Sequence, residues 1–187
     1  MKTACCVGLV LLLAGCDLFK TRDPEAPTQS ISTFETPTSH DIVLRNFSYA
    51  ISENNVRNYI RCFVDTLYRP YQFEPSPEEA PKFVVWTLES EQRYFQNIGV
   101  SLTGPSSLTD SVTLVNLSPG PPATAVYFLN YTLYVPHQDP RAPKLFRGSM
   151  ELDLTEDSLH LWSIYRWADK KTGPDSTWSY LKAWFNR

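Results

Sequence analysis

The sequence predicts an α+β fold, with helices near the start of the chain packed on a strongly curved, mostly antiparallel sheet. Between residues 38 and 63, apolar residues recur at helical spacing. From residue 111 onward they recur at every second position, which is the period of a strand. Residues 159–168 carry bulky side chains on both faces, as expected for an interior strand that is covered above and below.

One folded domain is predicted over residues 38–187, because 187 residues with 42% apolar composition can bury a single hydrophobic core. The net charge is −3, and the longest run of basic residues is Lys170-Lys171. Binding to nucleic acid requires a basic surface that neutralises phosphates, so the composition excludes nucleic acid as a partner.

The N-terminus carries the most specific signal in the chain. Residues 1–15 form a predicted signal peptide, whose apolar segment Val7–Leu13 is shorter than the roughly 20 residues of a membrane-spanning helix. The sequence Leu13-Ala14-Gly15-Cys16 resembles the lipobox of bacterial lipoproteins. This resemblance implies cleavage before Cys16 and attachment of acyl chains such as palmitate to that cysteine. It predicts a membrane-anchored cell-envelope protein, on a membrane and face that the sequence leaves open.

Residues 16–37 are predicted to form a lipid-anchored flexible tether, interrupted by Pro24, Pro27 and Pro37. A chain of this length has a root-mean-square reach of about 25 Å. Removal of the signal peptide and lipidation of Cys16 leave Cys62 as the remaining cysteine, so no disulfide forms within the mature chain. We expect Cys62 to be a small buried residue and not a reactive thiol.

The first two elements are predicted to be helices. A capping pattern at Thr38–Asp41 begins the first helix, which ends near Asn54-Asn55. The second helix covers Val56–Phe63. After a strand at residues 67–74, which Pro70 places at a sheet edge or bulge, a third helix covers residues 88–98. We expect Gly99 to end that helix in a left-handed conformation.

The second half of the chain is predicted to be a meander of antiparallel strands. The strands cover residues 112–115, 124–135 and 146–154, and they lead through a turn at residues 156–158 into residues 159–168. Ser176 can cap a short C-terminal helix whose apolar side is formed by Trp178, Leu181 and Phe185.

This order of elements resembles the nuclear-transport-factor-two-like cone fold, also called SnoaL-like. The resemblance covers residues 38–169 and rests on the amphipathic first helix, on Asn54-Asn55 followed by Tyr59 and Phe63, and on the late strand 161–167. A lipocalin-like barrel is the alternative. The two opening helices and the small number of strands stand against it, because such a barrel needs about eight strands.

The sequence contains no motif for a cofactor or a metal, so neither is predicted. His137 and Asp139 lie two residues apart in a proline-bounded loop. Because a zinc site needs three or four ligands, we interpret this segment as a solvated loop. His40 and His160 are expected to have surface or structural roles.

Cone-fold enzymes such as ketosteroid isomerase place an acidic or histidine side chain in an apolar pocket, where burial changes its pKa. No position matches their catalytic motifs, so no catalytic residue is predicted. The residues expected near such a pocket are weak candidates, namely Asp65, Tyr68, Asn130, Tyr131, Tyr165 and Arg166.

Two functions are compatible with these sequence features. In the first, the anchored cone-fold domain binds a small apolar ligand or a protein partner without catalysis. In the second, it is a pocket enzyme, namely an isomerase, dehydratase or hydrolase. A cavity of a few hundred cubic ångströms with a buried ionisable group and an open mouth would favour the enzyme, whereas an interior filled by aromatic side chains would favour binding. By analogy with other cone folds, a homodimer through the exposed sheet face is also expected.

Overall fold

The helices and strands follow one another in the order that the sequence predicts. The computed structural model describes residues 33–64, 67 and 69–187, and the folded unit covers Thr33–Arg187. Its elements are α2 (His40–Ser52), α3 (Val56–Ile60), β1 (Gln72–Glu74), the 3₁₀ turn η1 (Ala80–Lys82), α4 (Leu88–Ser101), β2 (Ser107–Ser118), β3 (Thr124–Tyr134), β4 (Leu145–Glu156), β5 (Trp162–Lys170) and α5 (Trp178–Phe185).

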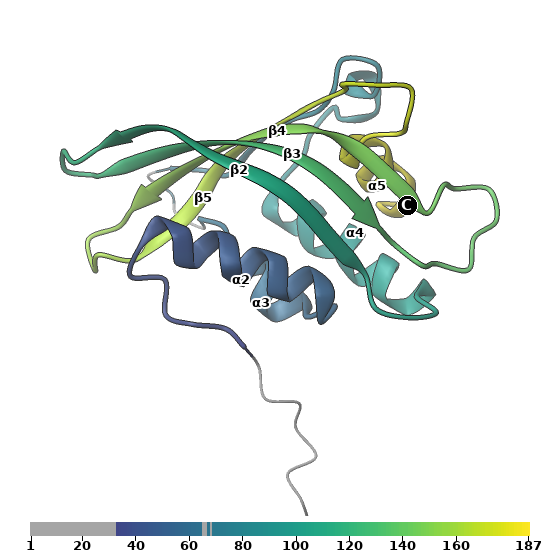
Figure 1. The fold of residues 1–187 in the computed structure, drawn as a ribbon, viewed down its shortest axis with the longest axis horizontal. Helices are drawn as coiled ribbons and strands as arrows, with labels where there is room; N and C mark the ends of the chain where they lie inside the picture. Colours follow the sequence, from purple (N-terminus) through teal and green to yellow (C-terminus); the bar gives the residue numbers. More distant parts are fainter. Residues whose placement is uncertain (1–32, 65–66, 68) are drawn as a thin grey trace, which may run out of the picture. The chain divides into compact units, whose positions relative to one another are not determined.

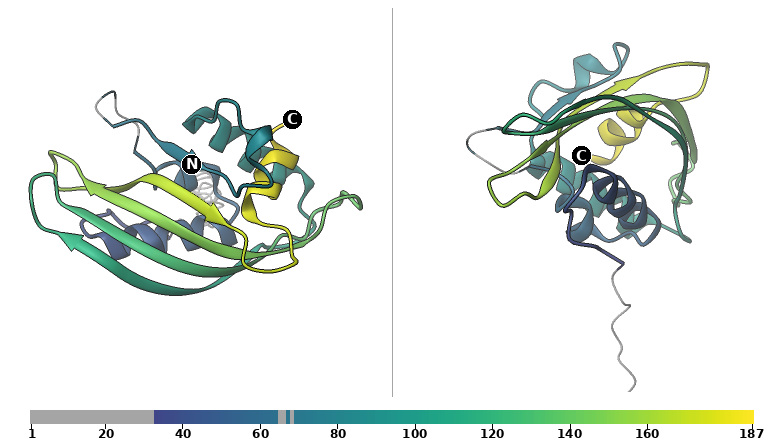
Figure 2. Two further views of the ribbon diagram at one scale, coloured as in Figure 1. Left: turned by 90° about the horizontal axis from the view of Figure 1, so that it is seen from above. Right: turned by 60° about the vertical axis from the view of Figure 1, so that its left-hand side comes forward.

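The strands form one five-stranded sheet in the order β1-β5-β4-β3-β2. Strands β2 to β5 are an antiparallel meander, and β1 pairs with β5 in parallel. The sheet bends over α2, α3 and α4, which lie along its concave side, and α5 lies at one end of that side (Figure 1). Viewed along the strands, the sheet curls around the helices (Figure 2, right). The predicted α+β class with a curved sheet is therefore confirmed.

The core lies between the concave face and the helices. On β3, buried and less buried positions alternate from Thr124 to Tyr134, so every second side chain points inward. The inward row pairs with Leu152, Leu154 and Met150 of β4, each fully buried. From α2, Phe47 reaches this layer and contacts the rings of Trp167 and Trp178 at 5.5 and 5.8 Å between centroids.

In strand β5, the side chains do not all point to the side of the sheet that strict alternation predicts. Strict alternation predicts Tyr165 and Trp167 on one side of the strand and Trp162 and Ile164 on the other. In the structure, the register with β4 shifts near Tyr165, because Leu154 pairs with Ile164 and Asp153 pairs with Arg166. This bulge brings Trp162, Ile164 and Trp167 together in the core, where they are at most 7% exposed.

The end of α4 also differs from prediction. Gly99 lies inside the helix, which continues to Ser101, and its φ is not positive. A Cβ at Gly99 would lie 2.6 Å from Nδ2 of Asn54, so the Asn54 side chain, just after α2, packs where a larger residue would place its Cβ. The left-handed residue is Asn54 itself, with φ of 51°, and it ends α2 near the predicted position.

Cys62 is 2% exposed, and burial raises the pKa of its thiol to about 12. The expectation that Cys62 is buried is confirmed, and a thiol with a raised pKa is a weaker nucleophile at neutral pH. Pro70 precedes β1, which is an edge strand as predicted. Within the described part of the chain, no helix combines the length and apolar character needed to cross a membrane. The predicted signal peptide, Cys16 and most of the tether fall outside the described residues.

Candidate functional site

The interior of the cone contains a buried ion pair, Glu91–Lys182. Glu91 lies in the first part of α4, where Thr87 caps the helix in a capping box with Ser90. Lys182 comes from α5 and donates to Oε1 of Glu91. Both side chains are fully buried. A buried charge pair is tolerated only when further polar groups complete its hydrogen bonding.

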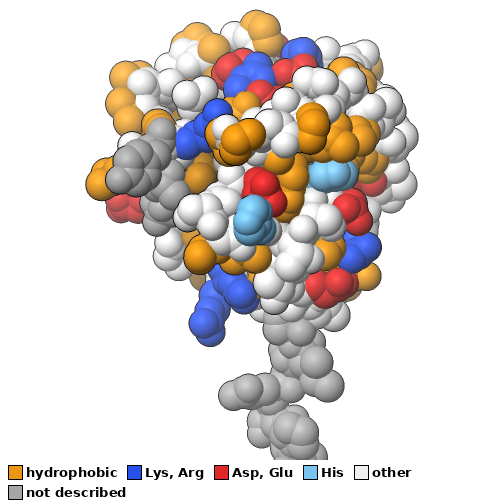
Figure 3. Space-filling view, turned by 90° about the vertical axis from the view of Figure 1, so that its left-hand side faces the viewer, with side chains coloured by type: hydrophobic (Ala, Val, Ile, Leu, Met, Phe, Trp, Pro, Cys, Tyr) orange, Lys and Arg blue, Asp and Glu red, His pale blue; other side chains and the backbone are white. Residues whose placement is uncertain are grey.

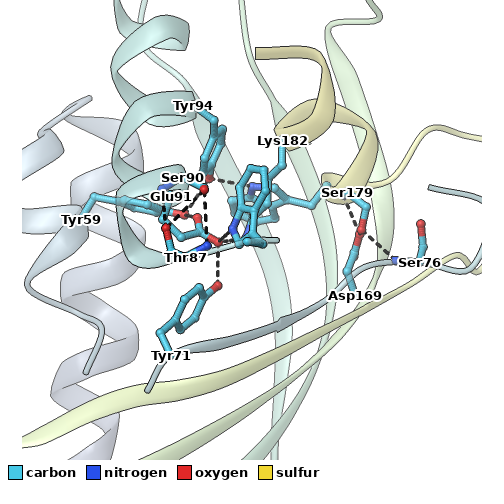
Figure 4. Close-up of polar contacts among 12 residues, drawn as sticks. Tyr59, Tyr71, Ser76, Thr87, Ser90, Glu91, Tyr94, Asp169, Ser179 and Lys182 are labelled. Atoms are coloured by element: carbon cyan, nitrogen blue, oxygen red, sulfur yellow. Dashed lines mark hydrogen bonds and ion pairs between the residues drawn. The ribbon is translucent and has the colours of Figure 1, made fainter. Parts of the chain in front are cut away.

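Three aromatic residues provide those hydrogen bonds (Figure 4). Tyr71 and Trp86 donate to Glu91 Oε1 at 2.6 and 2.8 Å, and Tyr59 donates to Oε2 at 3.0 Å. The Tyr59 hydroxyl also lies 2.6 Å from the hydroxyl of Tyr94. Burial, together with the nearby Glu91 carboxylate, raises the pKa of these three tyrosines well above the usual value, so they act as neutral donors.

Aromatic rings surround the ammonium group of Lys182. Its Nζ lies 3.5 Å from the ring centroid of Trp167 and 3.6 Å from that of Phe73. Such contacts stabilise a desolvated cation. Burial lowers the pKa of Lys182 to about 8, and the Glu91 carboxylate opposes this shift.

A second buried carboxylate, Asp169, joins β5 to α5. Tyr131 donates to Oδ1 at 2.7 Å, and the backbone N–H and hydroxyl of Ser179 donate to Oδ2 at 2.7 and 2.5 Å. The Tyr131 hydroxyl in turn accepts from the backbone N–H of Trp178 at 2.8 Å. Burial raises the pKa of Asp169, and these hydrogen bonds oppose that shift.

The interior is closed by ring packing. Tyr59 stacks on Phe95 with centroids 4.0 Å apart and planes 7° apart, and Trp167 meets Trp178 edge to face at 4.8 Å. The carboxylates of Glu91 and Asp169 are fully engaged with protein donors, and Nε1 of Trp167 is the buried polar atom in this region that lacks a partner. The cluster therefore has the organisation of a structural network.

Open space lies instead at the end of the cone, beside the β4–β5 hairpin. A cleft of about 290 Å³ is lined by apolar side chains with a few polar groups, namely Phe34, Pro37, Arg61, Phe63, Val64, Asp157, Leu161, Trp162 and Ser163. A neighbouring cleft of about 460 Å³ shares Val64, Asp157 and Ser163 with it. We call the first of these the end cleft. The space-filling view of this end shows hydrophobic side chains beside charged and histidine side chains (Figure 3).

A histidine–tyrosine pair lies behind the end cleft. Nδ1 of His40, at the start of α2, is 2.5 Å from the hydroxyl of Tyr127 on β3. The His40 ring also meets the Trp162 ring edge to face, with centroids 5.1 Å apart. Because Trp162 lines the end cleft, this pair is connected to that opening through one ring contact.

The residues expected near a pocket are placed on different faces. Tyr131 points inward and bonds to Asp169, as described above. Asn130 is exposed on the convex face. Tyr165 and Arg166 lie on the same face, and the bulge in β5 is the reason that Tyr165 does so. Arg166 forms ion pairs there with Glu74, Glu151 and Asp153. Asp65 and Tyr68 lie outside the described residues.

Glu91 and Lys182 were missed by sequence reasoning, although a signal for each exists. Glu91 occupies the apolar stripe of its helix with Leu88, Phe95 and Ile98. Lys182 likewise lies on the same stripe as the buried aromatic residues of α5. A charged residue at such a position predicts a buried partner, but not which one.

The proline-bounded loop is less solvated than predicted. His137 is fully buried, its Nε2 lies 2.9 Å from the Pro143 carbonyl oxygen, and its ring packs on Phe185. Asp139 instead pairs with Arg141 at 2.8 Å. Within the described ranges, no group of three His, Cys, Asp or Glu side chains is placed to hold a metal ion.

No protein-family model and no curated protein matches this sequence. Solved structures do match. A Novosphingobium aromaticivorans protein, provisionally described as a scytalone dehydratase, has a TM-score of 0.56 and 14% identity over 71% of this chain and 81% of that chain. A second protein from that organism, provisionally described as an aromatic ring hydroxylase, has a TM-score of 0.52 and 8% identity over 75% of this chain and 92% of that chain.

An NTF2-like superfamily protein from Salmonella enterica was also found, with a TM-score of 0.44 and 15% identity over 72% of this chain and 88% of that chain. At such identities a structural likeness shows the fold and not the activity. The TM-scores of 0.56 and 0.52 show that the chain shares the fold of the two Novosphingobium aromaticivorans structures, and the helices on a curved sheet agree with the cone fold that its order of elements predicts.

Proposed function

We propose that this chain is a bacterial cell-envelope lipoprotein, anchored through lipid on Cys16, whose cone-fold domain binds a target without transforming it. The anchor is supported by the Leu13-Ala14-Gly15-Cys16 sequence and the short apolar segment before it. Two or more acyl chains hold a protein stably at a membrane, since each buried methylene contributes about 0.8 kcal/mol.

The observation that carries the binding role is the contrast between the packed interior and the end cleft. In the interior, Glu91 is engaged by four protein donors, and aromatic rings occupy the space around it. A general acid or base needs an approach for substrate, which this packing does not offer. The end cleft is open and lined mainly by apolar groups.

The chemistry of the end cleft fits an apolar target with a polar end. Phe63, Leu161 and Trp162 provide apolar contact area, and Arg61 and Asp157 are polar groups of its lining. About 290 Å³ is close to the lower end of the volumes typical of ligand pockets. The target is therefore a small apolar molecule or one apolar side chain of a protein partner.

A photoactivatable phenylalanine analogue at position 161 in the full chain, irradiated in intact cells, tests the binding role. Leu161 lines the end cleft, whereas Leu159, two residues earlier in the same hairpin, is 74% exposed and outside its lining. We expect an adduct of defined mass, a small molecule or a protein, at position 161 and not at position 159. Equal labelling at both positions, or none at either, would contradict target binding in the end cleft.

The anchor has its own test. Cys16→Ser is expected to release the chain from the membrane fraction and to remove the mass of the acyl chains, because the thioether sulfur is lost. Cys62→Ser is the matched control, since Cys62 is buried and should leave fractionation unchanged. A Cys16→Ser chain that stays in the membrane fraction with unaltered mass would refute lipid anchoring.

The pocket enzyme remains the second candidate, and the His40–Tyr127 pair favours it. A hydrogen-bonded histidine next to an apolar opening can take the proton from the carbon beside a carbonyl group and return it to a β-hydroxyl group, which leaves as water. An aromatic β-hydroxy ketone serves as the probe, with the absorbance of the enone product as the readout. If the chain forms the enone and His40→Ala abolishes this activity, the enzyme is supported. If enone forms no faster than in the uncatalysed reaction, this reaction is excluded.

A further inference from the structure

Strand β2 presents an open sheet edge. It is last in the strand order and pairs only with β3 among the described strands. In an antiparallel pair, every second residue directs its N–H and C=O groups away from its partner strand. Among the described residues, no backbone hydrogen bond outside the regular elements involves residues 107–118. Eleven of the twelve residues of β2 are exposed.

The side chains of β2 do not protect this edge. Natural edge strands are usually short, charged or interrupted by proline, which prevents pairing with other chains. Strand β2 has twelve residues, contains no proline and carries one charge, on Asp110. Its row on the concave side includes Val112, Leu114 and Leu117, which are 46%, 43% and 49% exposed. The edge therefore offers both unpaired backbone groups and apolar side chains.

We propose that a second copy of this chain pairs with it along β2, antiparallel and edge to edge, so that the two sheets become continuous. A two-fold axis within residues 111–113 places Val112 and Leu114 of both copies on one face of the joined sheet. With the axis at residue 111 or 112, Asp110 lies opposite Val112 or Leu114 of the partner. With the axis at residue 113, the position opposite Asp110 falls beyond the register shift between Leu114 and Asn116. In each case the charge of Asp110 does not face its own copy.

The convex face is the less suitable surface for self-association. Its charged groups already satisfy one another, because Arg166 pairs with Glu74, Glu151 and Asp153. The proposal rests in one respect on the proposed lipid anchor. Confinement of two copies to one membrane raises their effective concentration and favours the β2 contact. The edge, rather than the exposed sheet face expected from the analogy, is therefore the proposed interface.

Cysteine cross-linking in the full chain tests this pairing. Single cysteines are placed at each position from 109 to 116, and membranes of expressing cells are treated with copper phenanthroline. A residue on the two-fold axis faces its own copy within disulfide range, at about 4.4–6.8 Å between Cα atoms. We expect one maximum in the yield of covalent dimer, within residues 111–113. The parent chain measures any background from the native cysteines.

Two controls distinguish this pairing from other contacts. Asn130→Cys lies on the convex face one strand inward, beside Ser111, and is too far from its own copy to cross-link across a β2 edge. Glu74→Cys marks the opposite sheet edge. A dimer yield at either control equal to the best β2 position, or a flat scan along β2, would overturn the proposal.

A charge on the edge supplies an independent readout. Leu114→Asp, combined with the best cysteine, places a carboxylate directly opposite or diagonal to Asp110 of the partner, and this repulsion is expected to reduce the dimer yield at least tenfold. Leu159→Asp, on an exposed leucine of another hairpin, should leave the yield unchanged. Unchanged cross-linking in the Leu114→Asp chain would also refute the pairing. Membrane fractionation of Cys16→Ser tests the anchor separately, so failure of either proposal is recognised by itself.

Discussion

The interior of the cone and the β2 edge treat polar groups in opposite ways. In the interior, the Glu91 and Asp169 carboxylates receive hydrogen bonds from side chains of several elements and are enclosed by aromatic rings. Along β2, half of the backbone groups face outward, and apolar side chains are close to half exposed. In this chain the interior is thus packed for stability, whereas the β2 edge leaves backbone and apolar groups available for contacts.

The two edges of the sheet repeat this contrast on a smaller scale. Strand β1 has three residues, and its Glu74 is held by Arg166 of β5 at 2.6 Å. Its shortness and its charges make it a poor template for another strand. Strand β2 has neither protection, so substitutions in the interior should change stability, and substitutions at β2 should change association.

The largest effect on stability is expected for Lys182→Met. Removal of the ammonium group leaves the buried Glu91 carboxylate without its ion-pair partner, which costs about 3–5 kcal/mol of unfolding free energy. The double variant Glu91→Gln/Lys182→Met removes both charges and should recover part of this loss. Urea unfolding measures both. A double variant as unstable as the single one would show that the charge pairing is not the main term.

A smaller loss is expected for Tyr131→Phe. Without its hydroxyl, Asp169 loses one donor and the backbone N–H of Trp178 loses its acceptor. Leaving such buried groups unsatisfied costs about 1–3 kcal/mol. Tyr134→Phe is the matched control, because Tyr134 lies on the same strand and is 42% exposed. Equal unfolding free energies for the two variants would contradict a structural role of the Asp169 cluster.

Substitution of the β2 edge should scarcely change stability. Leu114→Asp replaces a side chain that is 43% exposed, and a surface change of this kind is expected to alter the unfolding free energy by no more than about 0.5 kcal/mol. Circular dichroism and urea unfolding check this. A loss of several kcal/mol would mean that β2 belongs to the core and would end the contrast between edge and interior.

A small effect that depends on pH is expected at the protected edge, at β1. The hydrogen bond from Arg166 lowers the pKa of Glu74 below its unfolded value of about 4.3. Its contribution to stability is therefore present above that value and is lost as the pH falls through the folded pKa. Glu74→Gln should cost less than about 1 kcal/mol at pH 7, and the difference from the parent chain should shrink toward pH 3. A difference independent of pH would contradict the ion pair.

The order of the elements could be predicted from periodicity, because period and turn signals are local, and Pro70 indicated an edge or bulge for the first strand. The facing of Tyr165 could not, since the bulge that turns it outward depends on pairing with β4. The Glu91 network was equally inaccessible, because its partners lie 32 residues away at Tyr59 and 91 residues away at Lys182. The end cleft likewise depends on tertiary structure, since segments near residues 34, 63 and 162 form it together.

The central claim, a packed interior with binding at the end cleft, is tested most directly by nuclear magnetic resonance of the tryptophan indole N–H groups during titration with indole. We predict that the signal of Trp162, which lines the end cleft, shifts with saturation, whereas the signals of Trp167 and Trp178 stay in place. Saturable shifts of Trp167 and Trp178, with Trp162 unaffected, would contradict the account and would place the binding site inside the cone.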